Sequence, residues 1–249
     1  MTAHAIVSRD EWVEARKELL QKEKEVTRRN DELSRQRREL PWVRVDKQYV
    51  FDGPDGEQTL ADLFDRRSQL IVYHFMFGPG WEEGCDGCSF VADHIDGANL
   101  HLAHHDVSVV VVSRAPFSEF QAFKKRMGWN FTWVSSYGGE FNSDHHVSVT
   151  KDDFAQGKMF FYNYEPYEPE GEGESHGISV FYKDESGNVF HTYSSYARGV
   201  DILLGAHNYL DLTPKGRNET GTMDWVRHHD KYDDNGSVDP AEQHRAVSV

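Results

Sequence analysis

The sequence predicts an α/β protein: a central mixed sheet flanked by helices, with a long N-terminal helical arm. Two runs, residues 70–77 and 107–113, are apolar on both faces, as strands covered on both sides are. Each run is followed by a segment of helical character, and such alternation favours parallel strands joined by right-handed crossovers. Two strand-like segments late in the chain are separated by a turn, which predicts an antiparallel hairpin and makes the sheet mixed.

The arm is the first element. Residues 8–40 are dense in Glu, Lys, Arg and Gln and contain neither Gly nor Pro, and Ser8 with Glu11 matches a capping box. Apolar residues recur every seven positions, but Arg16 and Glu23 stand where a coiled-coil seam would need apolar partners. We interpret the segment as an arm that lies on its own domain or on a second copy in a homodimer. The apolar residues of this seam are Trp12, Leu19, Val26, Leu33 and Leu40.

The other elements follow from apolar runs bounded by Gly, Pro and Asp. In chain order we expect a strand at 48–51, a short helix at 59–65, the strand 70–77, a helix at 89–104, the strand 107–113, a helix at 116–127, a strand at 131–134, the hairpin strands 177–182 and 188–194, and a last helix at 197–210.

These elements divide the chain into three parts. We expect the arm at 1–41, a core domain at 42–217 and a C-terminal extension at 218–249 that is partly disordered. Within the core domain, residues 151–176 form an insertion rich in Glu and Pro, a composition that cannot build a hydrophobic core. We expect its acidic part, 163–176, to be a mobile loop or lid.

Charge narrows the classes of partner. The chain has 27 Lys and Arg against 42 Asp and Glu, a formal net charge of -15, which repels nucleic acid and anionic lipid surfaces. The first residues lack the basic and apolar regions of a signal peptide, and no apolar run is long enough to span a bilayer. We therefore expect a cytoplasmic protein that binds neither nucleic acid nor membrane.

The chemistry is expected at the two cysteines of the chain, Cys85 and Cys88. They are spaced C-x-x-C between a buried strand and a helix, the redox context of thioredoxin-like folds. Cys85 would attack a disulfide and Cys88 would resolve the mixed disulfide. The first helical N–H groups favour a thiolate, while Glu82, Glu83 and Asp86 oppose it. The sequence therefore predicts a reductant-like or mildly poised pair rather than a strong oxidant.

Two other functions stay open. The cysteines together with a nearby histidine, of which His94 is the best placed, would make a zinc or copper site, whereas the redox function needs no cofactor. The third alternative is a redox-inactive interaction protein that dimerises through the arm. The sequence Arg227-His228-His229-Asp230 is either an acid–base relay or, as we favour, an ion-pair cluster that fastens the C-terminal extension.

Several motifs resemble a bacterial thioredoxin-like family of unknown function, described as predicted dithiol-disulfide oxidoreductases (domain of unknown function eight-nine-nine) and related to thioredoxins and peroxiredoxins. The resemblance covers nearly the whole chain and implies a thioredoxin-like fold with a redox pair, without defining the substrate or the electron donor. The motifs are Cys85–Phe90, Asp96–Ala98, Val112–Pro116, Lys125–Trp129, Tyr209–Arg217 and Trp225–Asp230.

The chain departs from better-known relatives at two points. Thioredoxins have a cis-proline before the third core strand, yet no proline lies between Pro116 and Pro166. Peroxiredoxins need Thr or Ser three residues before the peroxidatic cysteine, and Glu82 stands there. We expect a thiol or disulfide substrate, docked differently from thioredoxin substrates. The predicted substrate contacts are Trp81, Asp86, Gly87 and Arg114.

Overall fold

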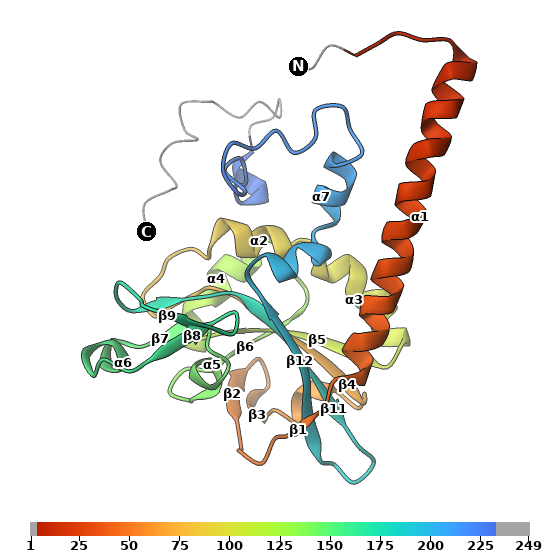
Figure 1. Cartoon of the computed structure of the whole chain (residues 1–249). Helices are drawn as coiled ribbons and strands as arrows, with labels where there is room; N and C mark the ends of the chain where they lie inside the picture. The colour runs from red at the N-terminus through yellow and green to blue at the C-terminus, as the bar shows by residue number, and fades with distance from the viewer. Residues whose placement is uncertain (1–3, 233–249) are drawn as a thin grey trace. The chain divides into compact units, whose positions relative to one another are not determined.

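The computed structural model describes residues 4–232 (Figure 1). The chain divides into two units, Met1–Trp42 and Val43–Val249, one residue from the predicted boundary. Part of the predicted C-terminal extension, residues 233–249, lies outside the described residues. No helix within 4–232 combines the length and hydrophobicity needed to cross a bilayer.

The first unit is the helix α1 (Arg9–Glu39), as predicted. Its capping box is present: the Ser8 N–H donates to Glu11 Oε2 at 2.9 Å, and the Glu11 N–H donates to Ser8 Oγ at 3.3 Å. None of its residues is buried, and the seam residues stay partly exposed. Dimerisation through this helix remains a prediction.

The second unit contains an eight-stranded mixed sheet with the order β1-β12-β11-β4-β5-β6-β2-β3. The central strands β4, β5 and β6 are parallel, whereas β11 pairs antiparallel with both β4 and β12. The strands of this sheet are β1 (Val43–Arg44), β2 (Val50–Gly53), β3 (Gly56–Thr59), β4 (Gln69–His74), β5 (Val107–Ser113), β6 (Thr132–Ser135), β11 (Gly177–Lys183) and β12 (Val189–Tyr196).

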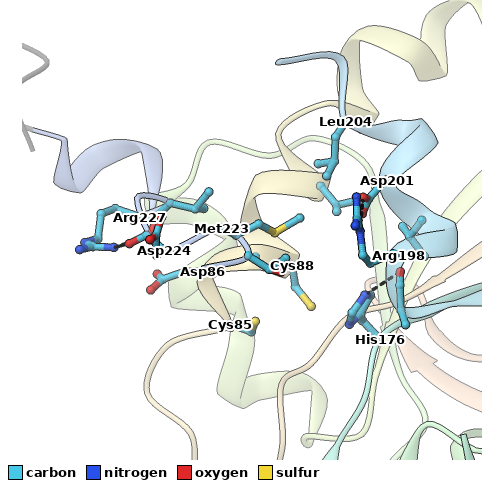
Figure 2. A pocket seen from close by; sticks show the side chains of 16 residues that line it. Cys85, Asp86, Cys88, His176, Arg198, Asp201, Leu204, Met223, Asp224 and Arg227 are labelled. Atoms are coloured by element: carbon cyan, nitrogen blue, oxygen red, sulfur yellow. Dashed lines mark hydrogen bonds and ion pairs between the residues drawn. The ribbon is translucent and has the colours of Figure 1, made fainter. Parts of the chain in front are cut away.

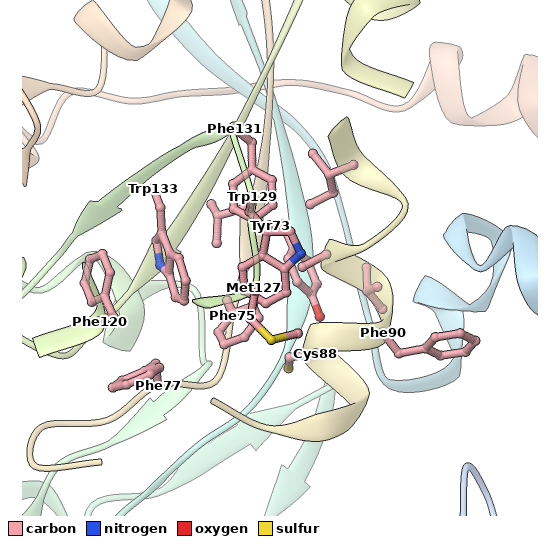
Figure 3. Packing of buried hydrophobic residues seen from close by; sticks show 14 of the residues in the cluster. Tyr73, Phe75, Phe77, Cys88, Phe90, Phe120, Met127, Trp129, Phe131 and Trp133 are labelled. Carbon is pink, nitrogen blue, oxygen red and sulfur yellow. The ribbon is translucent and has the colours of Figure 1, made fainter. Parts of the chain in front are cut away.

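Side chains of the central strands alternate between two hydrophobic clusters, because successive residues of a strand point to opposite faces. Leu70 and Val72 of β4 pack into one cluster, and Tyr73 packs into the other. The second cluster holds the aromatic core and Cys88 (Figure 3). It is covered by the helices α2 (Asp86–Ala92), α3 (Ile95–His104) and α4 (Phe117–Arg126) (Figure 1). This arrangement is a thioredoxin-like fold with the cysteine pair directly after β4.

The structure corrects the predicted helix 89–104, which is two helices, α2 and α3, separated at Asp93 and His94. The His94 N–H bonds to Val91 O at 3.0 Å instead of the helical acceptor Phe90 O, and the His94 ring Nδ1 takes that acceptor at 2.7 Å. The side chain therefore competes with the backbone for the same carbonyl and tightens the turn.

Two further predicted helices differ. Residues 197–210 form the 3-10 helix η2 (Ala197–Leu203) and the helix α7 (Gly205–Leu210), because the fully buried Leu204 has non-helical backbone angles. Residues 59–65 contain the end of β3 and the 3-10 helix η1 (Asp62–Phe64), where Asp62 accepts a bond from the Thr59 N–H at 2.8 Å.

The acidic insertion also has regular structure. Glu174 near its end is buried and ion-paired with Arg114, so this part of the insertion is anchored in the domain rather than loose. Its elements are α6 (Lys151–Ala155), the hairpin β8 (Phe160–Tyr162) and β9 (Glu165–Tyr167), and β10 (Gly173–Glu174), which pairs with β7 (Ser148–Val149). The remaining elements are α5 (Phe141–Asp144) and the 3-10 helix η3 (His229–Lys231).

Candidate active site

The cysteine pair lies at the start of α2, where Cys85 is the N-cap residue. Both cysteines are free thiols: Cys85 is half-buried, whereas Cys88 is 2% exposed and belongs to the aromatic core. Close approach to the core shapes the loop before them. A Cβ atom on Gly84 would come within 2.4 Å of the Phe75 ring, so this position accepts only glycine without a shift of the loop or the ring.

The two sulfur atoms interact directly. The Cys88 thiol donates a hydrogen bond to the Cys85 sulfur and lowers the pKa of Cys85 to about 7, against the effect of burial. The backbone N–H groups of Cys88 and Gly87 also lower this pKa, and the Asp86 charge raises it. Burial raises the pKa of Cys88 well above its ordinary value. Near neutral pH, Cys85 is therefore the thiolate and Cys88 the proton-bearing partner.

The carboxylates around the pair act less uniformly than the sequence predicted. Hydrogen bonds from Lys231 and Arg126 lower the pKa of Glu83 to about 2, so its charge is compensated by two cations. Asp86 alone of the three acidic neighbours is among the groups that raise the pKa of Cys85. A pKa of about 7 agrees with the reductant-like pair expected from the sequence.

The reactivity of Cys85 should follow this pKa. We expect its rate of alkylation by iodoacetamide to be half-maximal near pH 7 and to rise about tenfold from pH 6 to pH 8, because the thiolate is the nucleophile. Mass spectrometry after timed quenching measures the rate. In Cys88→Ser the thiol donor is replaced, and the midpoint should move. A wild-type midpoint above about pH 8.5, the value of a free thiol, would contradict the assignment.

A cavity of about 430 Å³ opens beside the pair (Figure 2). In Figure 2 both sulfur atoms point toward the space bordered by His176, the residue directly before β11. The His176 Nε2 bonds to Ala197 O at 3.3 Å, and burial lowers the pKa of this histidine. The apolar walls of the cavity are Val91, Ala197, Val200, Leu204, Met223 and Val226.

The C-terminal segment, residues 218–232, supplies one wall of the cavity because it is fastened to the cysteine loop. The buried His228 donates from Nε2 to Gly84 O at 2.8 Å and accepts from Arg126 at Nδ1, also at 2.8 Å. Arg126 pairs with Asp230 at 3.0 Å. The sequence Arg227-His228-His229-Asp230 thus fastens the segment, as we favoured from the sequence.

Among the predicted substrate contacts, Asp86 and Gly87 line the cavity and Trp81 and Arg114 do not. Trp81 is 38% exposed and lies near the Phe77 ring. The Arg114 Nε donates to Glu174 Oε1 at 2.5 Å, so the structure engages the guanidinium in an internal ion pair. The sequence analysis missed the contribution of His176, Met223 and residues 197–204; only the apolar character of Met223 and Val226 hinted at packing.

The structure also corrects the alternative metal set of Cys85, Cys88 and His94. Both ring nitrogens of His94 are occupied: Nδ1 bonds to Phe90 O at 2.7 Å, and Nε2 accepts from the Ala206 N–H at 3.0 Å. Within residues 4–232, no three His, Cys, Asp or Glu side chains are arranged so that they could hold a metal ion.

Comparison with known proteins places the chain in a family. Residues 1–232 match the family described as "bacterial protein of unknown function (DUF899)". The chain belongs to this family. No curated protein matches the DUF899 chain in sequence.

Similar solved structures are those of redox proteins at low identity. Peroxiredoxin Q of Xanthomonas campestris is 15% identical, with 63% of this chain and 88% of that chain covered and a TM-score of 0.40. Peroxidoxin BcpB of Mycobacterium tuberculosis is 14% identical, with 66% and 94% covered and a TM-score of 0.43. A putative protein disulfide isomerase of Bacteroides thetaiotaomicron is 15% identical, with 72% and 94% covered and a TM-score of 0.35.

Proposed function

We propose that this DUF899 protein is a thiol–disulfide oxidoreductase. The observation that carries the proposal is the asymmetry of the pair: a half-buried Cys85 with a lowered pKa borders a cavity and accepts a hydrogen bond from the fully buried Cys88. An accessible nucleophile backed by a protected second thiol is the arrangement that dithiol exchange requires.

The reaction proceeds in two exchanges. The Cys85 thiolate attacks a substrate disulfide RS–SR′, the S–S bond breaks, and R′S⁻ leaves as Cys85–S–S–R forms. Cys88 loses its proton to R′S⁻ or to water and attacks the Cys85 sulfur; the Cys85–Cys88 bond forms and RS⁻ leaves. The substrate gains two electrons and the protein loses them. An external dithiol, proposed as the cytoplasmic electron donor, reduces the pair again.

A small disulfide with apolar groups suits the cavity better than a folded protein. A volume of about 430 Å³ lies in the range of small-molecule sites, and its walls are mainly aliphatic side chains. The net charge of -15 further disfavours anionic disulfides. A protein disulfide remains the second candidate substrate.

The test compares wild type with Cys85→Ser in the reduction of 2-hydroxyethyl disulfide, dithionitrobenzoate and insulin, with dithiothreitol as donor. We expect the variant to fall to the uncatalysed rate and the neutral small disulfide to be the best substrate. A matched circular dichroism spectrum and melting temperature control for folding.

Equal rates in wild type and variant would remove the enzymatic proposal and favour a redox-inactive interaction protein. Metal analysis of the freshly purified wild type tests the zinc and copper alternative in the same preparation, because a thiolate-bound metal would be lost in Cys85→Ser.

A further inference from the structure

Tyr73 is a buried polar group that the proposed reaction has not used. It lies in β4, is 1% exposed and packs in the aromatic core beside Cys88. Figure 3 shows its hydroxyl pointing toward the Cys88 sulfur. Within residues 4–232, no nitrogen or oxygen atom satisfies this hydroxyl. An unsatisfied buried hydroxyl costs free energy, which calls for an explanation.

The Cys88 sulfur is the partner that the structure offers. The two side chains make a loose O–H···S contact, through which Tyr73 lowers the pKa of Cys88 while burial raises it. Burial also holds the pKa of Tyr73 well above its ordinary value, so the hydroxyl keeps its proton and remains a donor. Catalytic hydrogen bonds are often long in the free enzyme and tighten during the reaction.

We infer that Tyr73 is a catalytic residue of the resolving step, whose hydroxyl donates a hydrogen bond to the Cys88 thiolate. The inference rests on the proposed oxidoreductase function. In the reduced pair the hydrogen bonds run from Tyr73 to Cys88 to Cys85, and Cys88 keeps its proton. Once Cys85 is bound in a mixed disulfide, it can no longer accept that proton as a thiolate would. Cys88 must then ionise in an apolar core.

The hydroxyl stabilises that ionised form. Cys88 gives its proton to R′S⁻ or to water, and the Tyr73 O–H donates to Cys88 S⁻ without giving up its own proton. The thiolate then attacks the Cys85 sulfur and expels RS⁻. When a donor thiolate attacks Cys85 of the oxidised pair, the same bond stabilises Cys88 S⁻ as the leaving group. The backbone N–H of Met76 also donates to Cys88, so loss of Tyr73 would slow both steps without abolishing them.

Tyr73→Phe removes the oxygen atom and keeps the ring. In single turnovers with 2-hydroxyethyl disulfide, we expect release of the second thiol to slow about tenfold, as loss of one hydrogen bond to a charged group permits. The pH at which this step is half-maximal should rise. Alkylation of Cys85 at pH 7 should change less than twofold, because the first attack does not need Cys88 to ionise.

Tyr196→Phe is the matched control. Tyr196 is a buried tyrosine whose hydroxyl bonds to Ser194 and Ser179 rather than to either cysteine, so this variant should resolve at the wild-type rate. An unchanged resolving rate in Tyr73→Phe would overturn the role of Tyr73. Equal slowing of both exchanges would also overturn it, because general damage to the core has that effect. Failure of the proposed function is distinguishable: the wild type itself would then form no mixed disulfide.

Discussion

Cys88→Ser is expected to stop the reaction halfway. Cys85 would still attack a disulfide, but no thiol would remain to displace the second half of the substrate. The variant should release one equivalent of thiol per chain and then stall, with a mass increase of one substrate half on Cys85. The physical reason is the protection of the site: the Cys85 sulfur is half-buried, so a second substrate thiol reaches it slowly. Intact-mass spectrometry and peptide mapping measure both results.

Two controls define this result. Cys85→Ser should form no stable adduct, because the remaining Cys88 is fully buried and its pKa is raised by burial. Dithiothreitol should remove the adduct from Cys88→Ser and restore the unmodified mass. An adduct on Cys88 in the first variant, or continued turnover in the second, would contradict the assigned roles of the two cysteines.

Arg114→Leu is expected to destabilise the fold by about 3–5 kcal/mol near pH 7, because it leaves the Glu174 carboxylate buried without its counter-charge. Burial already raises the pKa of Glu174 above 4.5, and loss of Arg114 would raise it further. A carboxyl with a raised pKa in the folded state favours the protonated form. The loss of stability should therefore be largest above that pKa and should shrink as the pH falls toward 4.5. Urea unfolding at several pH values measures it.

The double variant Arg114→Leu with Glu174→Leu should recover most of the lost stability, since it leaves no unpaired charge in the core. A deficit that grows on acidification would contradict the account. The same variants separate two roles of Arg114. If the guanidinium contacts substrate, as the sequence suggested, the double variant will show a raised KM although it is stable; the internal ion pair predicts an unchanged KM.

Local patterns were enough to predict the scaffold of the site. The two strands apolar on both faces, the hairpin and the capped α1 follow from residue periodicity and capping chemistry, which act over a few neighbouring residues. The position of Cys85 and Cys88 between a buried strand and a helix follows in the same way. The predicted helices failed where side chains intervened, as at His94, whose ring competes for a backbone carbonyl.

Long-range contacts set the properties of the site. The sequence shows that Glu83 and Asp86 are close to the cysteines, but not that Lys231 and Arg126 compensate Glu83. His228 bonds to Gly84 although 144 residues separate them, and Arg114 pairs with Glu174 across 60 residues. Many residues of opposite charge or matching polarity are available to each of these groups, so one sequence cannot indicate which pairs form.

The sequence by itself therefore determined the fold class, the reactive pair and its place at the start of a helix, because these depend on spacing along the chain. The tertiary structure alone decided that Cys88 is sealed in the aromatic core against Tyr73, that Arg114 is engaged by Glu174, and that the C-terminal segment helps to wall the cavity. The reason is physical: burial and pairing are set by which distant segments pack together, and they control pKa and access more strongly than neighbours in sequence do.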